Sequence, residues 1–93
     1  MYLYVYDCHA GASSNARRVA FTKELYGVRY SWKTKDGVRE RNIPGIIDLC
    51  AGTEIVTDSA ILVPDECRAA LDALFERYRD VVYYRVFRVL GER

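Results

Sequence analysis

The chain has 93 residues, a formal net charge of +1, and a composition that is 51% hydrophobic and 29% charged. This length allows one domain with a single modest core, and this composition excludes an intrinsically disordered chain. No apolar run approaches the roughly 20 residues of a membrane-spanning helix. We therefore expect one globular domain over residues 1–93 that makes no membrane contact.

The three cysteines are odd in number and widely spaced, at Cys8, Cys50 and Cys67, and they form no Cys-x-x-Cys motif. This pattern argues against a disulfide framework and against a structural zinc site. The first residues also lack the basic start, the long apolar stretch and the cleavage site of a secretion signal. We expect reduced cysteines and a cytoplasmic protein.

The first predicted strand alternates two kinds of side chain. Tyr2, Tyr4 and Tyr6 share one face, and Leu3 and Val5 share the other, because successive strand residues point to opposite faces. We expect Leu3 and Val5 to face the core. The tyrosines would then lie on the bare face of a sheet, where they could stack on nucleobases, meet a partner sheet or cover a half-exposed surface.

This strand ends at Asp7, the best candidate for a catalytic or metal-binding carboxylate. In a two-fold dimer, two such aspartates could share a Mg²⁺ ion, which prefers oxygen ligands and could activate water beside a phosphodiester. An aspartate that only caps the following turn explains the same residue. Cys8 and His9 adjoin it, but neighbouring strand residues point to opposite faces, so they offer little for catalysis.

A loop of small residues at 8–14 precedes a helix that we predict over residues 15–26, ending at Gly27. The apolar residues of this helix do not form one clear stripe, so its packing face is not assigned. Arg17 and Arg18 in the first turn, together with the free N–H groups of the helix start, could hold an anion. A plainly capped helix explains the same pattern.

Strands predicted over residues 28–34 and 38–43 are joined at Asp36-Gly37, a strong hairpin signal, and their charge indicates an exposed ribbon. Basic and aromatic residues alternate here, as in proteins that contact phosphates while stacking on unpaired bases. The alternative is that Tyr30 and Trp32, which share one face, belong to the core. The candidate nucleic-acid contacts are Arg17, Arg18, Arg29, Tyr30, Lys33 and Lys35.

The second half of the chain contains two short predicted strands, at residues 54–56 and 60–63, and then the clearest helix, which begins at Pro64-Asp65. Its apolar stripe consists of Cys67, Ala70, Leu71, Leu74, Phe75 and Tyr78. A last strand is predicted over residues 81–90. The segment at residues 44–64 has no assigned functional role.

This order of elements predicts an α+β, ferredoxin-like β-α-β-β-α-β fold, with an antiparallel sheet, two helices on one face and an extra β-hairpin. In that fold the first and last strands are neighbours. One register adds aromatic residues of the last strand to the bare tyrosine face, which would favour a homodimer. The expected interface residues are Tyr2, Tyr4, Tyr6, Tyr83 and Phe87.

Four short motifs lie in the N-terminal third: Tyr6-Asp7, Arg17-Arg18-Val19, Tyr26-Gly27 and Tyr30-Ser31. In these motifs the chain resembles the small CRISPR-associated endoribonuclease-type proteins, the dimeric subunit of the spacer-acquisition complex. The resemblance implies a ferredoxin-like homodimer in which Asp7 is linked to a metal ion. The chain departs from that family after Ser31, in its hairpin and in the segment that follows.

Two functions are compatible with these observations. The first is a nucleic-acid-associated protein that binds RNA or DNA, with metal-dependent phosphodiester hydrolysis at Asp7 if it is an enzyme. The second is a non-catalytic interaction or dimerisation module whose tyrosine-rich face forms the subunit interface.

Overall fold

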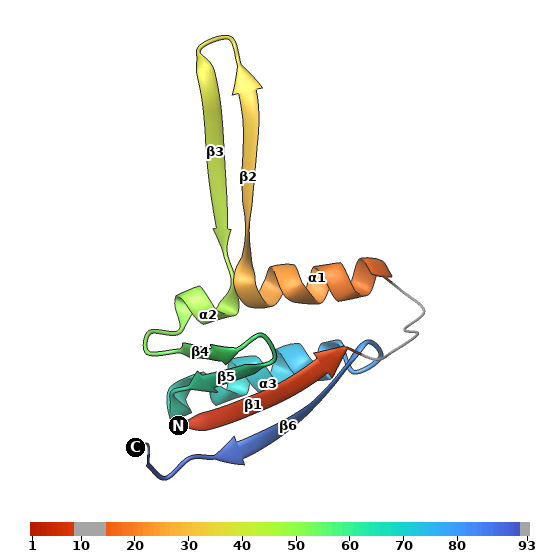
Figure 1. The fold of residues 1–93 in the computed structure, drawn as a ribbon, viewed down its shortest axis with the longest axis vertical. Helices are drawn as coiled ribbons and strands as arrows, with labels where there is room; N and C mark the ends of the chain where they lie inside the picture. Colours follow the sequence, from red (N-terminus) through yellow and green to blue (C-terminus); the bar gives the residue numbers. More distant parts are fainter. Residues whose placement is uncertain (9–14, 92–93) are drawn as a thin grey trace.

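The computed structural model describes residues 1–8 and 15–91, which form a four-stranded body and a long projecting β-hairpin (Figure 1). The body strands are β1 (Tyr2–Cys8), β4 (Glu54–Thr57), β5 (Ala60–Val63) and β6 (Val82–Arg88). The hairpin strands are β2 (Gly27–Thr34) and β3 (Gly37–Pro44). The helices are α1 (Asn15–Tyr26), α2 (Ile46–Leu49) and α3 (Arg68–Arg77), with a 3₁₀ turn at Asp65–Cys67.

The body sheet is antiparallel throughout, in the order β4-β5-β1-β6. The α+β class, the antiparallel sheet and the pairing of the first strand with the last are therefore confirmed. The described chain also contains a third helix and a separate two-stranded sheet, so the exact ferredoxin-like order is not confirmed. None of the helices in the described residues is long and apolar enough to cross a bilayer.

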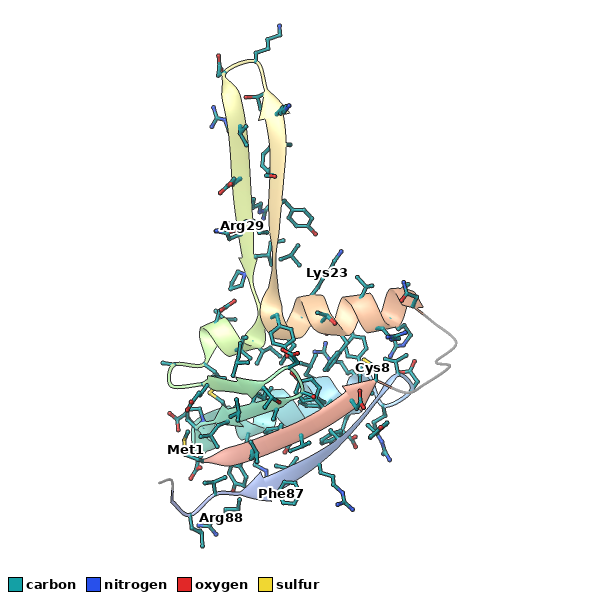
Figure 2. The ribbon with its side chains drawn as sticks, viewed as in Figure 1. Met1, Cys8, Lys23, Arg29, Phe87 and Arg88 are labelled. Atoms are coloured by element: carbon teal, nitrogen blue, oxygen red, sulfur yellow. A yellow bond between two sulfur atoms is a disulfide. The ribbon has the colours of Figure 1, made fainter. Side chains whose placement is uncertain are left out.

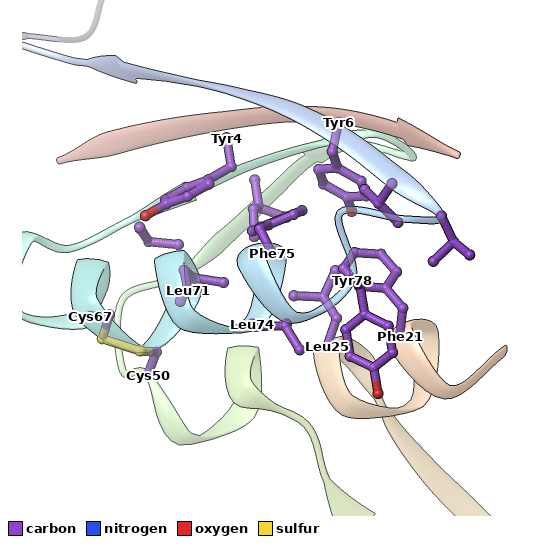
Figure 3. Close-up of a cluster of buried hydrophobic side chains, with 14 residues drawn as sticks. Tyr4, Tyr6, Phe21, Leu25, Cys50, Cys67, Leu71, Leu74, Phe75 and Tyr78 are labelled. Carbon is purple, nitrogen blue, oxygen red and sulfur yellow. A yellow bond between two sulfur atoms is a disulfide. The ribbon is translucent and has the colours of Figure 1, made fainter. Parts of the chain in front are cut away.

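Helix α3 packs its predicted apolar stripe against the body sheet (Figure 3). Leu71, Leu74 and Phe75 are fully buried and Tyr78 is nearly so, whereas Ala70 is exposed. From α1, which lies on the same side of the sheet, Phe21 and Leu25 enter this core. Their side of α1 is therefore the packing face that periodicity left open.

The predicted orientation of β1 is wrong. Tyr4 and Tyr6 are buried against α3 (Figure 3). Val5, which alternates with them along the strand, is exposed on the opposite face of the sheet. Burial of Tyr4 is possible because its hydroxyl donates to Asp72 Oδ1 (2.5 Å) and has the Arg68 carbonyl oxygen as an alternative acceptor at 3.2 Å. Burial, followed by the Asp72 hydrogen bond, raises the pKa of Tyr4 well above its usual range.

Because the orientation differs, the predicted role of the tyrosine face is also wrong. Tyr6 bonds through its hydroxyl to that of Tyr26, and Tyr2 packs beside the core with the Arg68 guanidinium 4.4 Å from its ring centroid. Tyr2, Tyr4 and Tyr6 thus cover α3 of their own chain and do not form the bare face. Tyr83 and Phe87 do lie on the face away from the helices.

The cysteine prediction is also wrong, because Cys50 and Cys67 form a disulfide (Figure 3). Their Cα atoms lie 6.2 Å apart, as a disulfide requires. The bond joins the end of α2 to the turn that leads into α3. Cys8 is the free cysteine.

The hairpin leaves the body through a backbone crossing at Gly27 and Gly45. A Cβ at Gly45 would lie 2.3 Å from the Gly27 nitrogen and 2.3 Å from the Leu25 carbonyl oxygen. Gly27 has a φ of 89°, a conformation that favours glycine. These two glycines bring the ends of the hairpin together, and its strands then project away from the body (Figure 1). At about 3.3 Å per residue, strands of this length extend about 26 Å.

Candidate functional site

Residues 29–44 of the β2–β3 hairpin are all exposed, and their side chains project to both sides of the ribbon (Figure 2). The turn consists of Lys35 and Asp36, with Gly37 paired to Thr34 at a φ of 129°. The expected exposed ribbon is therefore confirmed. Tyr30 and Trp32 are not core residues, since their exposed fractions are 45% and 48%.

The strand register decides which side chains share a face. Tyr30 pairs with Arg41 and Trp32 pairs with Arg39, and directly paired residues of antiparallel strands lie on the same side. Nearer the body, Val28 pairs with Ile43 on this side. We call these six residues the aromatic face of the hairpin.

The other predicted hairpin contacts lie elsewhere on the ribbon. Arg29 and Lys33 lie on the opposite face, because they alternate with Tyr30 and Trp32 along one strand. Lys35 is in the turn at the tip. The sequence prediction therefore grouped residues that the hairpin separates.

Arg39 and Arg41 were not among the predicted contacts. Alternation along a single strand places basic and aromatic residues on opposite faces, whereas the paired strand supplies the basic residues of the same face. The Asp36-Gly37 sequence could have identified these two arginines, because a hairpin turn at that point makes β3 the partner of β2.

The net positive charge of the molecule lies in the hairpin. Residues 27–44 contain five basic and two acidic side chains, for a net charge of +3. The whole chain has a net charge of +1, so the remaining residues have a net charge of −2. The hairpin is therefore the basic region of an otherwise slightly acidic protein.

A groove of about 330 Å³ continues the aromatic face at the base of the hairpin. Its apolar lining includes Val28, Tyr30, Ile43, Pro44, Ile46 and Leu49, and Lys23, Glu24 and Arg77 border it. The groove thus extends from Tyr30 of the aromatic face to Ile46 and Leu49 of α2.

Arg17 and Arg18 lie at the first turn of α1, whereas the hairpin begins after its last turn, roughly 18 Å away. Arg17 donates through Nη2 to Asp80 Oδ1 (2.8 Å) and to the Arg77 carbonyl (2.6 Å). The hydrogen bond to Asp80 raises the pKa of Arg17. These contacts attach α1 to the α3–β6 connection, so the structure does not bring Arg17 and Arg18 to the hairpin.

Asp7 lies on the side of the sheet away from the helices, where it pairs with Tyr83 of β6. One carboxylate oxygen accepts from the Cys8 backbone N–H (2.9 Å), and the Tyr83 hydroxyl is 3.4 Å from the other. Within residues 1–8 and 15–91, no three His, Cys, Asp or Glu side chains are close enough to share a metal ion. His9 lies outside the described residues.

The face of the sheet away from the helices forms a second exposed surface, which we call the outer face. It comprises Leu3, Val5, Tyr83, Arg85 and Phe87, together with Leu62, which is only 6% exposed. Val5, Tyr83 and Phe87 are 40%, 52% and 47% exposed, and Figure 2 shows Phe87 pointing away from the body.

Comparison of the chain with protein-family models, with curated proteins and with solved structures gives no match.

Proposed function

We propose that this protein binds nucleic acid through its β2–β3 hairpin. The observation that carries the proposal is the aromatic face, where Tyr30 and Trp32 lie opposite Arg41 and Arg39 on an element of net charge +3. Arginine contacts phosphates and aromatic rings stack on bases, so one face supplies both kinds of contact. Electrostatic attraction to the phosphate backbone provides the affinity.

The binding constant should fall steeply as salt is added. If the hairpin neutralises about four phosphates of a single strand, the binding constant should fall roughly 50-fold between 50 and 200 mM salt. Substitutions Arg39→Gln and Arg41→Gln should each weaken binding and lower the slope of log K against log salt by about 0.7. Fluorescence anisotropy of a labelled oligonucleotide measures both quantities.

Arg88→Gln is the matched control, because it removes the same charge from the exposed end of β6 (Figure 2). It should leave the salt slope nearly unchanged. Equal losses for Arg88→Gln and Arg39→Gln would mean that the whole surface, and not the hairpin, attracts the ligand.

Catalysis is not included in this proposal. Phosphodiester hydrolysis at Asp7 would need a divalent cation with several oxygen ligands, and the described part of the chain offers no group of three candidate ligands. The resemblance of the N-terminal third to the CRISPR-associated endoribonuclease-type family supports nucleic acid as the class of ligand. It does not supply the missing ligands.

We also infer a ferredoxin-like core. When the hairpin and α2 are set aside, the remaining elements run β1-α1-β4-β5-α3-β6, with β1 between β5 and β6. A cytoplasmic location stays a prediction, and the Cys50–Cys67 disulfide weighs against it because disulfides persist mainly in oxidising compartments.

A second candidate function is self-association through the outer face. Exposed Val5, Tyr83 and Phe87 form an apolar centre, and Arg85 on β6 and Glu54 on β4 are oppositely charged residues toward its two edges. A copy related by a two-fold axis parallel to the strands would place unlike edges opposite each other. Apolar patches of this kind mark interaction surfaces.

Phe87→Glu should then convert a dimer into a monomer, as measured by light scattering during size-exclusion chromatography. Loss of a central aromatic residue costs about 2 kcal/mol or more, which corresponds to a dissociation constant roughly thirty-fold higher. Val19→Glu, at an exposed apolar residue of α1, is the control and should leave the dimer intact. A wild-type protein that is monomeric at all concentrations would exclude this candidate.

A further inference from the structure

We infer that the ligand of the hairpin is a single-stranded nucleic acid, whose bases stack on Tyr30 and Trp32 and reach the groove at the hairpin base. This inference rests on the proposed function and adds the strandedness of the ligand and its path. Its basis is the aromatic face, the groove and the charge of the hairpin.

Ring stacking requires bases whose planes are accessible. In a duplex the planes are covered by neighbouring bases and only the edges face the grooves, whereas a single strand can splay its bases onto aromatic side chains. Tyr30 and Trp32 are both about half exposed in the middle of the hairpin. Their Cα atoms are about 6.7 Å apart along the strand, or roughly two stacking intervals of about 3.4 Å, so successive unstacked bases can use both rings.

Each ring is accompanied by an arginine on the paired strand. Tyr30 pairs with Arg41 and Trp32 with Arg39, and the Cβ atoms of such pairs are about 5 Å apart. A base stacked on either ring therefore brings its phosphate within reach of a guanidinium. Rings and cations therefore recur along one face of the hairpin, as bases and phosphates recur along one nucleic-acid strand.

The groove gives the strand a path toward the body. It begins at Tyr30 and passes Val28 and Ile43 to reach Ile46 and Leu49 of α2, with Leu49 74% exposed. Its volume of about 330 Å³ lies in the range of small-ligand sites and exceeds the space that one water occupies. An unpaired base fits this apolar lining, and Lys23 at the border provides a positive charge for its phosphate.

The opposite face of the hairpin is less suited to the ligand. Arg29 donates through Nε to Asn42 Oδ1 (3.2 Å), so one of its five N–H groups is already engaged within the hairpin. Glu40 lies on the same face, paired with Ser31, and would repel a phosphate. A two-stranded ribbon can enter the major groove of a duplex, and this polar face is the one that such binding would use.

Trp32 is the single tryptophan of the chain, so its fluorescence reports on the hairpin alone. Titration with 12-nucleotide oligothymidylate or oligouridylate should quench this fluorescence, and comparison of the two separates DNA from RNA as the preferred strand. A 12-base-pair duplex of mixed sequence should bind at least ten-fold more weakly at equal salt and should quench little.

Trp32→Ala should weaken binding of the labelled single strand roughly 5- to 150-fold, the range expected for one base–aromatic stack. Trp32→Phe should recover most of this loss because it retains a ring. Val38→Ala, which shortens an exposed apolar side chain of the opposite face, should leave the affinity unchanged. Circular dichroism should give the same folded spectrum for all three variants, since residues 32 and 38 lie outside the core.

The inference is overturned if the duplex binds as tightly as the single strand, or if Trp32→Ala and Val38→Ala have equal effects. In either case salt-dependent binding through the hairpin, and with it the proposed function, would stand. If neither nucleic acid binds at low salt, the proposed function and this inference both fail.

Discussion

Replacement of Phe75 by alanine should lower the free energy of unfolding by about 3–5 kcal/mol. Phe75 is fully buried, and four aromatic rings surround it, with centroid distances of 5.3 Å to Tyr4, 5.3 Å to Tyr6, 5.4 Å to Phe21 and 4.7 Å to Tyr84. Truncation would leave a cavity among β1, β6 and both long helices. A domain of this size has a total stability of only about 5–15 kcal/mol, so the variant should be barely folded.

Urea denaturation followed by circular dichroism measures this loss. Phe75→Leu, which fills part of the space, should lose less than the alanine variant. Leu49→Ala truncates an apolar side chain that is exposed on α2, and should change stability by no more than about 0.5 kcal/mol. A loss below about 1 kcal/mol for Phe75→Ala would mean that the five rings do not form one packed cluster.

Loss of the Cys50–Cys67 disulfide should lower the free energy of unfolding by about 3 kcal/mol. The bond closes a loop with a sequence separation of 17, and the entropy that this cross-link removes from the unfolded chain accounts for that value. Because about 1 kcal/mol shifts the melting temperature of such a domain by roughly 4–8 °C, the Cys50→Ala, Cys67→Ala double variant should melt more than about 10 °C below the wild type.

A reducing agent provides the matched test. It should lower the melting temperature of the wild type and leave that of the double variant unchanged. Cys8→Ala, which removes the free thiol, should retain the sensitivity to reduction. Alkylation of the unfolded, unreduced protein should modify Cys8 alone, and modification of all three cysteines would show that the disulfide is absent from the protein in solution.

The sequence predicts the elements of this fold better than their orientation. Periodicity identified β1, both strands of the hairpin and α3, because each has a clear pattern of its own. The orientation of β1 was not encoded in that pattern, since Tyr4 and Tyr6 on one face and Leu3 and Val5 on the other are both acceptable core residues. The choice depends on Asp72, which accepts from the Tyr4 hydroxyl, and that contact spans 68 positions of the chain.

The disulfide and the hairpin face illustrate two different reasons for a missed site. Cys50 and Cys67 approach each other only because α2 returns to the start of α3, and no local spacing predicts such a contact. Arg39 and Arg41, in contrast, could have been assigned to the face of Trp32 from the turn and the period of two. Prediction of the disulfide required knowledge of the tertiary structure. Assignment of Arg39 and Arg41 required only the pairing of two neighbouring strands.

The glycine crossing at the base of the hairpin makes the length of the arm independent of the body. The chain departs at Gly27 and re-enters at Gly45, where the two backbones touch, so the body is closed whatever lies between them. Removing two residues from each strand would shorten the reach by about 6.7 Å and keep every remaining side chain on its original side. Insertions and deletions in this arm can therefore adjust how far it extends without a compensating change elsewhere.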